Sequence, residues 1–438
     1  MKRLLIISFF LIFSLVSLIG CDTDPTEEPI SVETYSLIQL QADYDQMVGL
    51  IDRNPKLFTN LDELNSLVVS QRELLTEGMT KLEFYRVLVK VIAAIRCGHS
   101  GIQMPWSEIE TIFENDMTYP VSVYLFDEAL RIVSINGQTA IEIGDEIKSI
   151  NGVSIPDITL EMMSMLSADG EGTSLKKRVL ADAYFEYYQL FIAVSETLVV
   201  EYIDSLTNEI KVEMLNLNSI NYDHYIQNPA YEYQITSEYA LLTVREFSPH
   251  DSYTMQSYLN FFSDFFSVVD QLEIEHVILD IRGNGGGDPR ITSALFSYIA
   301  MTSQPYFNQA TSNYYVGLKS NIPLSEPHFD GHLYTLIDGY CFSSCGHLAA
   351  LIKYQNIGTM IGEETNGSYV CTDSSASYTL TNSRLSFRTS TAAWGVAVEG
   401  FELGRGVSPN IEISISFEDY LNGLDTALLY TIDLIESE

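Results

Sequence analysis

Two segments of the sequence contain residues whose type and spacing could do chemistry. Residues 276–287 form an apolar run, His-Val-Ile-Leu-Asp-Ile, that passes into the loop Arg-Gly-Asn-Gly-Gly-Gly. Residues 333–347 run from a second apolar stretch into Tyr-Cys-Phe-Ser-Ser-Cys-Gly-His, which predicts a strand, a turn and a helix. Glycine N–H groups can bind a negatively charged oxygen, and a serine in a strand–turn–helix lies beside a helix N-terminus. The two segments together therefore predict an oxyanion hole and a serine nucleophile.

A serine hydroxyl is a poor nucleophile at neutral pH unless a base lies nearby. His99 is the best candidate, because the glycines of Cys-Gly-His-Ser-Gly (residues 97–101) allow it to project into a cleft. An ordinary surface-loop histidine is the alternative reading. His347 lies one helical turn beyond Ser343, where a packing role is expected.

The base comes from a different part of the chain from the serine. Residues 33–115 show apolar spacing typical of a small helical unit. Its helices are expected at residues 36–51, 60–75 and 80–96. Thr80 and Glu83 form a capping-box pattern at the start of the last helix, which leads to His99.

A β module is expected over residues 116–215. Within it, Ile-Gly-Asp-Glu-Ile-Lys-Ser-Ile-Asn-Gly-Val-Ser-Ile (residues 143–155) predicts a hairpin with an Asn-Gly turn. This hairpin resembles the Gly-Asp-x-Ile-x-x-Ile-Asn-Gly hairpin of PDZ domains, which capture a peptide terminus as an added strand. A purely structural role for the module is the alternative.

The serine and the glycine loop belong to a third unit, residues 230–438. Apolar runs of strand length alternate there with helical segments. That alternation predicts a mostly parallel sheet covered by helices on both faces. The whole chain is therefore expected to be a multidomain α+β protein.

A family resemblance follows from these motifs. The first segment is similar to the Leu-Asp-Leu-Arg-x-Asn-x-Gly-Gly signature of the carboxyl-terminal processing peptidases. The second, with Ile-Gly-Glu-Glu-Thr-Asn-Gly at residues 361–367, resembles their nucleophile region and the Gly-Glu-Pro-Thr-x-Gly that follows it. Together with the PDZ-like hairpin, the resemblance covers most of residues 80–415. It implies a serine peptidase whose α/β core has the mostly parallel sheet of ClpP and crotonase.

The resemblance also implies roles for individual residues. Aligned from Gly362, it makes Ser343 the nucleophile and the N–H of Ser344 one half of the oxyanion hole. The N–H of Gly285 or Gly286 would supply the other half. The alternatives are Ser344 as nucleophile, and Ser343 as a turn or N-cap residue.

The chain departs from the Ser–Lys branch of this family. That branch has a lysine where this sequence has Ser368, and the nearest lysine, Lys353, belongs to the predicted helix. The branch typified by the tricorn core protease uses serine with histidine and an acidic residue, and its Gly-His-Ser or Gly-His-Thr resembles the sequence around His99. The resemblance therefore implies His99 as general base and Glu402 as its acidic partner, with Glu399 as a competitor.

The N-terminus and the charge indicate where the protein works. Lys2 and Arg3, an apolar run over residues 4–19 and the ending Leu-Ile-Gly-Cys resemble a bacterial lipoprotein signal. This implies removal of residues 1–20, lipid on Cys21, a tether over residues 21–32 and anchoring to the cell membrane outside the cytoplasm. A plain signal peptide or signal anchor is the alternative. A net charge of −36 argues against a nucleic-acid partner.

The remaining cysteines leave the disulfide pattern open. An exported protein can pair them, and neither a Cys-x-x-Cys pair nor matching histidine spacing indicates zinc. They are Cys97, Cys341, Cys345 and Cys371. Cys345 as nucleophile is a minor alternative, and no metal or organic cofactor is implied.

These observations predict a secreted, lipid-anchored serine endopeptidase that acts on protein or peptide substrates. Three other readings remain. Because the family lysine is absent, the chain could be an inactive homologue that binds a peptide or another ligand. The same nucleophile could also serve an esterase or another acyl transferase. Since the same fold serves binding in some relatives, the chain could also be a retinoid- or lipid-binding module.

Overall fold

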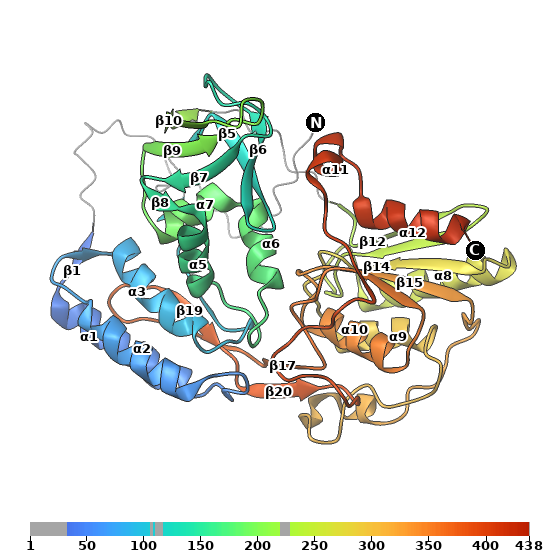
Figure 1. Cartoon of the computed structure of the whole chain (residues 1–438). Coiled ribbons are helices and arrows are strands. Elements are labelled where there is room, and N and C mark those ends of the chain that lie inside the picture. The colour runs from blue at the N-terminus through green and yellow to red at the C-terminus, as the bar shows by residue number, and fades with distance from the viewer. Residues whose placement is uncertain (1–32, 106–107, 110–116, 220–227, 438) are drawn as a thin grey trace, which may run out of the picture.

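The computed structural model describes residues 33–105, 108–109, 117–219 and 228–437. The expected signal peptide (residues 1–20), the tether (21–32) and Cys21 lie outside the described residues. We call residues 33–219 the N-terminal half and residues 228–437 the C-terminal half. Figure 1 shows the two halves side by side. The late strands β17 (Val370–Asp373), β19 (Ser386–Thr389) and β20 (Ala392–Gly395) reach from the C-terminal half toward the N-terminal helices.

The predicted N-terminal helices are present. They are α1 (Leu37–Ile51), α2 (Leu61–Glu73) and α3 (Lys81–Ala93). The predicted capping box is formed, because the Thr80 side chain accepts from the Glu83 N–H and the Glu83 side chain accepts from the Thr80 N–H. The helix α3 ends before its predicted end at Arg96, where the backbone turns through a left-handed conformation (φ 56°).

An antiparallel sheet forms the rest of the N-terminal half, in the order β10-β9-β7-β6-β5 with β8 paired to β7. Its strands are β5 (Val121–Phe126), β6 (Ala129–Ile135), β7 (Glu146–Ile150), β8 (Val153–Ser154), β9 (Thr197–Ile203) and β10 (Ile210–Asn216). The predicted hairpin is β7–β8, where Asn151 and Gly152 both have positive φ (51° and 80°), as a type I′ turn requires.

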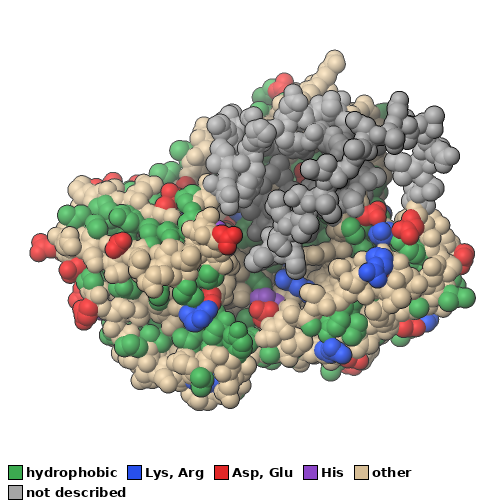
Figure 2. Space-filling view, turned by 180° about the vertical axis from the view of Figure 1, so that it is seen from behind, with side chains coloured by type: hydrophobic (Ala, Val, Ile, Leu, Met, Phe, Trp, Pro, Cys, Tyr) green, Lys and Arg blue, Asp and Glu red, His purple; other side chains and the backbone are tan. Residues whose placement is uncertain are grey.

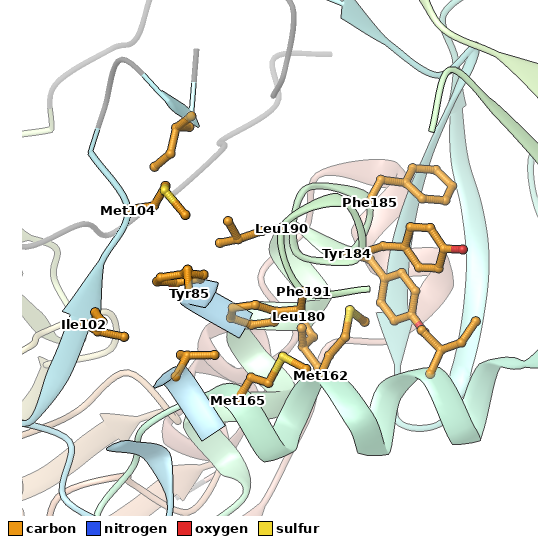
Figure 3. Close-up of a cluster of buried hydrophobic side chains, with 14 of the residues drawn as sticks. Tyr85, Ile102, Met104, Met162, Met165, Leu180, Tyr184, Phe185, Leu190 and Phe191 are labelled. Carbon is orange, nitrogen blue, oxygen red and sulfur yellow. The ribbon is translucent and has the colours of Figure 1, made fainter. Parts of the chain in front are cut away.

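Apolar side chains join the helices of this half. The helix α5 (Ile155–Met165) packs against α3, and α7 (Tyr184–Phe191) accepts hydrogen bonds from Arg86 of α3 through its backbone, whereas α6 (Ser174–Asp182) packs against β5. In Figure 3, Tyr85 of α3, Met162 and Met165 of α5 and Phe191 of α7 belong to one cluster of buried apolar side chains. Burial of this cluster fixes α5 relative to the helix that leads to His99.

The C-terminal half contains the predicted parallel sheet, in the order β12-β13-β14-β15-β16-β21. Only β12 runs antiparallel to its neighbour. The strands are β12 (Tyr231–Ile235), β13 (Ala240–Val244), β14 (His276–Asp280), β15 (His332–Ile337), β16 (Thr359–Gly362) and β21 (Ile411–Glu412). The expected fold class, multidomain α+β with a mostly parallel sheet, is confirmed.

Helices cover both faces of this sheet. They are α8 (Met255–Gln271), α9 (Pro289–Ser297), α10 (Ser344–Tyr354) and α12 (Thr426–Glu436). Val277 and Leu279 of β14 pack in the cluster with α8, α9 and α10, whereas Ile278 packs in the cluster with Ile435 of α12. The apolar runs that predicted these strands thus reflect burial on both faces.

Short elements complete the fold. They are β1 (Thr34–Tyr35) paired with β2 (Met79–Thr80), β4 (Met117–Thr118) paired with β11 (Asn218–Ser219), the 3₁₀ helix Asn313–Lys319 and α11 (Phe417–Asn422). Among the described residues, no helix combines the length and the apolar character that crossing a bilayer requires.

Strands from the end of the chain connect the two halves. They are β17 (Val370–Asp373), β18 (Ala376–Thr379), β19 (Ser386–Thr389) and β20 (Ala392–Gly395). The strand β19 pairs with β3 (Gly101–Gln103), which directly follows the His99 turn. Asp43 of α1, which is 1% exposed, accepts the N–H groups of Asn382 and Ser383 in the β18–β19 turn. The turn therefore depends on a buried carboxylate of the N-terminal half.

Asp43→Ala should destabilise the protein. The change leaves the buried turn donors without an acceptor, at a cost of about 2–3 kcal/mol. Thermal unfolding followed by circular dichroism would measure it as a lower melting temperature. Asp45→Ala on the same helix is the matched control, because the Asp45 side chain is 58% exposed and pairs with Arg72 at the surface. Equal melting temperatures for the two variants would contradict the role of Asp43.

Candidate active site

Ser343 lies in a strained turn between β15 and α10. Its backbone angles are φ 53° and ψ −124°, which only a surrounding structure that fixes them can maintain in a residue with a side chain. Ser343 stands at the N-cap position of α10, but its side chain makes no capping hydrogen bond. Ser343 therefore lies in a turn at the N-cap position, as the alternative reading expected, but its side chain does not cap the helix.

The Ser343 hydroxyl instead meets His99. The distance from His99 Nε2 to Ser343 Oγ is 3.1 Å, across 244 positions of sequence. The His99 residue is 8% exposed, and the centre of its ring lies 4.4 Å from that of Phe342. Figure 2 shows a histidine at the boundary between the two halves, with acidic and basic side chains beside it.

The C-terminal half holds the His99 turn from several sides. Cys97 Sγ lies 2.9 Å from Thr372 Oγ1 and 3.1 Å from Ser390 Oγ. The Ser375 hydroxyl donates to the His99 carbonyl oxygen at 3.1 Å. The position of the imidazole thus depends on contacts with residues far along the chain.

Burial keeps the imidazole neutral. Desolvation lowers the pKa of His99 to about 4, although the negative charge of Asp373 raises it in part and the positive charge of Arg388 lowers it further. A neutral imidazole at pH 7 can accept a proton from the serine hydroxyl.

The glycine loop lies directly against the serine turn. A Cβ atom on Gly286 would come within 2.7 Å of Ser343 Cβ and 2.9 Å of Ser344 N, so only glycine fits there. Asn284 holds the two segments together, because its carbonyl oxygen accepts from Phe342 N at 3.1 Å and its side-chain oxygen accepts from Gly286 N at 2.8 Å. The Gly286 N–H is therefore occupied.

Two backbone donors remain beside the serine. Within the described part of the chain, the N–H groups of Gly285 and Ser344 bind no acceptor. Of the two glycines expected as donors, the structure leaves Gly285 free. The role of Asn284 was not predicted, although the asparagine is part of the motif that carried the family resemblance.

The disulfide question is answered at the same turn. Cys341 pairs with Cys345, and the bond spans the turn that contains Ser343. Cys97 and Cys371 are buried free thiols. Close backbone contact also holds the turn, since a Cβ atom on Gly367 would lie 2.9 Å from Ser343 N.

The sequence of the C-terminal half identifies its family. Residues 238–413 match the model of peptidase family S41. This stretch is a peptidase family S41 domain. The chain is therefore a serine-type peptidase. Ser343 and the glycine loop lie inside the S41 domain, whereas His99 lies outside the matched residues.

Solved structures share the fold beyond the S41 domain. A crystal structure of mature CPAF superposes with a TM-score of 0.61 at 12% identity, over 88% of this chain and 96% of that one. Mature CPAF complexed with lactacystin gives a TM-score of 0.61 at 12% identity, over 92% of this chain and 100% of that one. At this identity the likeness concerns the fold alone. No curated protein matches the sequence.

The predicted acidic residues do not reach the imidazole. Glu402 and Glu399 are both exposed, and within the described residues neither forms an ion pair or hydrogen bond with His99. The acid beside the ring is Asp373 at the end of β17, whose Oδ2 lies 3.8 Å from His99 Nε2. The position of Asp373 depends on the path of the chain after the S41 motifs. No sequence motif identifies this residue.

Neither Lys353 nor Ser368 supplies a base. Lys353 lies in the last turn of α10, about 13 to 14 Å along the helix from its start at Ser344. Ser368 is 6% exposed, and its hydroxyl has no hydrogen-bond partner in the described structure. His347 packs against Phe307 and Cys371 rather than facing the serine, as expected for a packing residue.

The rate should fall only at a lower pH than in an enzyme whose catalytic histidine has its ordinary pKa. A His99 that acts as the base must be neutral, and its pKa is lowered to about 4, so we expect kcat/KM to persist to roughly pH 4–5. Asp373→Asn should move this fall in rate to still lower pH, because the Asp373 charge raises the pKa. Hydrolysis of a fluorogenic peptide across pH 3–9 measures both. Glu402→Gln is the control, and a shift in that variant instead would restore Glu402 as the acidic partner.

Removal of the disulfide should impair the serine turn. We expect the double variant Cys341→Ala, Cys345→Ala to lose about 10-fold in kcat, because small displacements of a reacting group reduce rates by factors of this size. The rate of labelling by a fluorophosphonate reports on the serine. Circular dichroism checks that the sheet remains folded, and an unchanged labelling rate would show that the turn is held without the bond.

Proposed function

We propose that the protein is a lipid-anchored serine endopeptidase in which Ser343 is the nucleophile and His99 the general base. The observation that carries the proposal is the 3.1 Å contact between His99 Nε2 and Ser343 Oγ. A neutral, buried imidazole supports it, because such a ring can accept the hydroxyl proton at physiological pH.

The reaction follows from these positions. His99 accepts the proton while Ser343 Oγ attacks the peptide carbonyl carbon. The carbonyl oxygen becomes an oxyanion, and the N–H groups of Ser344 and Gly285 donate to it; each such donor contributes about 100–1,000-fold in rate. His99 then returns the proton to the leaving amine. Water hydrolyses the acyl-enzyme with the same imidazole as base.

Asp373 takes the acidic role in this scheme. Its carboxylate lies 3.8 Å from His99 Nε2 and would stabilise the imidazolium formed during attack. The His99 Nδ1 atom is buried without a hydrogen-bond partner in the described structure, and the Thr372 backbone nearby favours the protonated ring. The scheme requires no metal or organic cofactor.

The location of the enzyme is part of the proposal. The basic pair Lys2 and Arg3, the apolar run and the cysteine at position 21 support export and lipid attachment. Protein or peptide chains outside the cytoplasm are then the substrates, and the PDZ-like module would present their ends. Loss of membrane association in Cys21→Ser, with peptidase activity retained, would test the anchor.

A fluorophosphonate probe tests the nucleophile. Labelling should disappear in Ser343→Ala, fall at least about 100-fold in rate in His99→Ala and persist in Ser344→Ala. Gel fluorescence and peptide mass mapping measure the outcome. Labelling that survives Ser343→Ala would overturn the assignment. Turnover of a simple ester without cleavage of any unfolded protein would favour the esterase.

A further inference from the structure

The connection between α5 and α6 lies against the His99 turn. Gly170 N donates to the Arg96 carbonyl oxygen at 3.0 Å, and the Glu171 carboxylate pairs with the Arg96 guanidinium. Arg96 has a positive φ of 56°, so these contacts hold a strained residue just before the turn. The connection is itself fixed at one end, because α5 packs against α3 (Figure 3).

The opposite side of this connection meets the S41 domain. Glu171 N donates to the Gly404 carbonyl oxygen at 2.9 Å. A Cβ atom on Gly170 would lie 2.2 Å from Gly404 Cα, which shows how closely the two backbones approach. The connection therefore lies between the His99 turn and a loop of the S41 domain, and it contacts both.

Asp169 is the buried acid of this connection. It is 4% exposed, and its Oδ1 accepts the Gly98 N–H at 2.7 Å. Its Oδ2 has no hydrogen-bond partner in the described structure. Burial raises the pKa of Asp169 to about 7, and the charge of Asp373 adds to this effect. A buried carboxyl with an unpartnered oxygen is costly, which indicates a task other than stability.

Gly98 is packed closely against Phe342 as well as bound to Asp169. A Cβ atom on Gly98 would lie 2.6 Å from the Phe342 ring, and the Gly98 N–H donates to Asp169. The Phe342 ring also contacts the imidazole. The hydrogen bond from Gly98 N to Asp169 thus sets how far the His99 turn extends toward Ser343.

We propose that Asp169 is a positioning residue for the peptidase reaction, which fixes the His99 imidazole opposite Ser343 by accepting the Gly98 N–H. The proposal rests on the proposed role of His99 as base. It gives the N-terminal half a second contribution to the site, because Asp169 comes from the connection that follows α5 of the predicted PDZ-like module.

Three substitutions at Asp169 separate positioning from folding. Asp169→Asn keeps an acceptor for the Gly98 N–H and should retain kcat within about 3-fold of the unmodified protein. Asp169→Leu fills the same space without an acceptor, and Asp169→Ala removes the group. Both should lower kcat by about 10–100-fold with little change in KM, because the imidazole is misplaced and the substrate site is not.

Asp145 provides the matched control. It is 1% exposed in the same half and also accepts backbone N–H groups, from Ser205 at 2.8 Å and Glu142 at 2.9 Å. Asp145→Ala should lower the melting temperature but leave kcat unchanged per active site, as counted by fluorophosphonate titration.

Results for the Asp169 variants can be distinguished from a failure of the proposed role of His99 as general base. Full activity of His99→Ala would refute the general base itself, whatever Asp169 does. With His99 essential, unmodified kcat in folded Asp169→Leu would overturn the positioning role. An Asp169→Asn variant as impaired as Asp169→Leu would overturn it too, because the acceptor alone would then be insufficient. If Asp169→Ala fails to fold, the Asn and Leu variants decide.

Discussion

The contact between His99 and Ser343 is the constraint on which the rest of the structure depends. The two residues belong to different halves of the molecule, yet proton transfer requires their atoms to stay within hydrogen-bond distance. Strand pairing between β3 and β19, the packing of Cys97 against Thr372 and the contact of Ser375 with the His99 carbonyl all act on this distance. Under the proposed mechanism, contacts between the halves therefore contribute to catalysis as well as to stability.

The nucleophile turn illustrates how a costly backbone conformation is maintained. A positive φ at a residue such as Ser343 costs about 1–3 kcal/mol, and the chain tolerates it only where neighbours leave no alternative. Here the neighbours are the backbones of Gly286 and Gly367, which both approach the turn closely, and a disulfide spans it. Any side chain at either glycine would displace the serine.

The sequence was sufficient for those parts of the site that local patterns encode. Apolar runs predicted the parallel strands, and the glycine and serine motifs marked the loop and the turn that contains Ser343. Asp373 could not be predicted, because its distance from His99 depends on how β17 crosses between the halves. The same holds for Asp169, whose partner Gly98 is 71 positions away. Such long-range pairings leave no periodicity in the sequence.

The pairing of β3 with β19 also sets when this enzyme can act. A chain is synthesised from its N-terminus, so the His99 turn is made long before residues 386–390, which anchor it. A nascent chain that already contains Ser343 still lacks the strand that brings the imidazole to it. Under the proposed mechanism, hydrolysis begins only when nearly the whole chain has been made and folded.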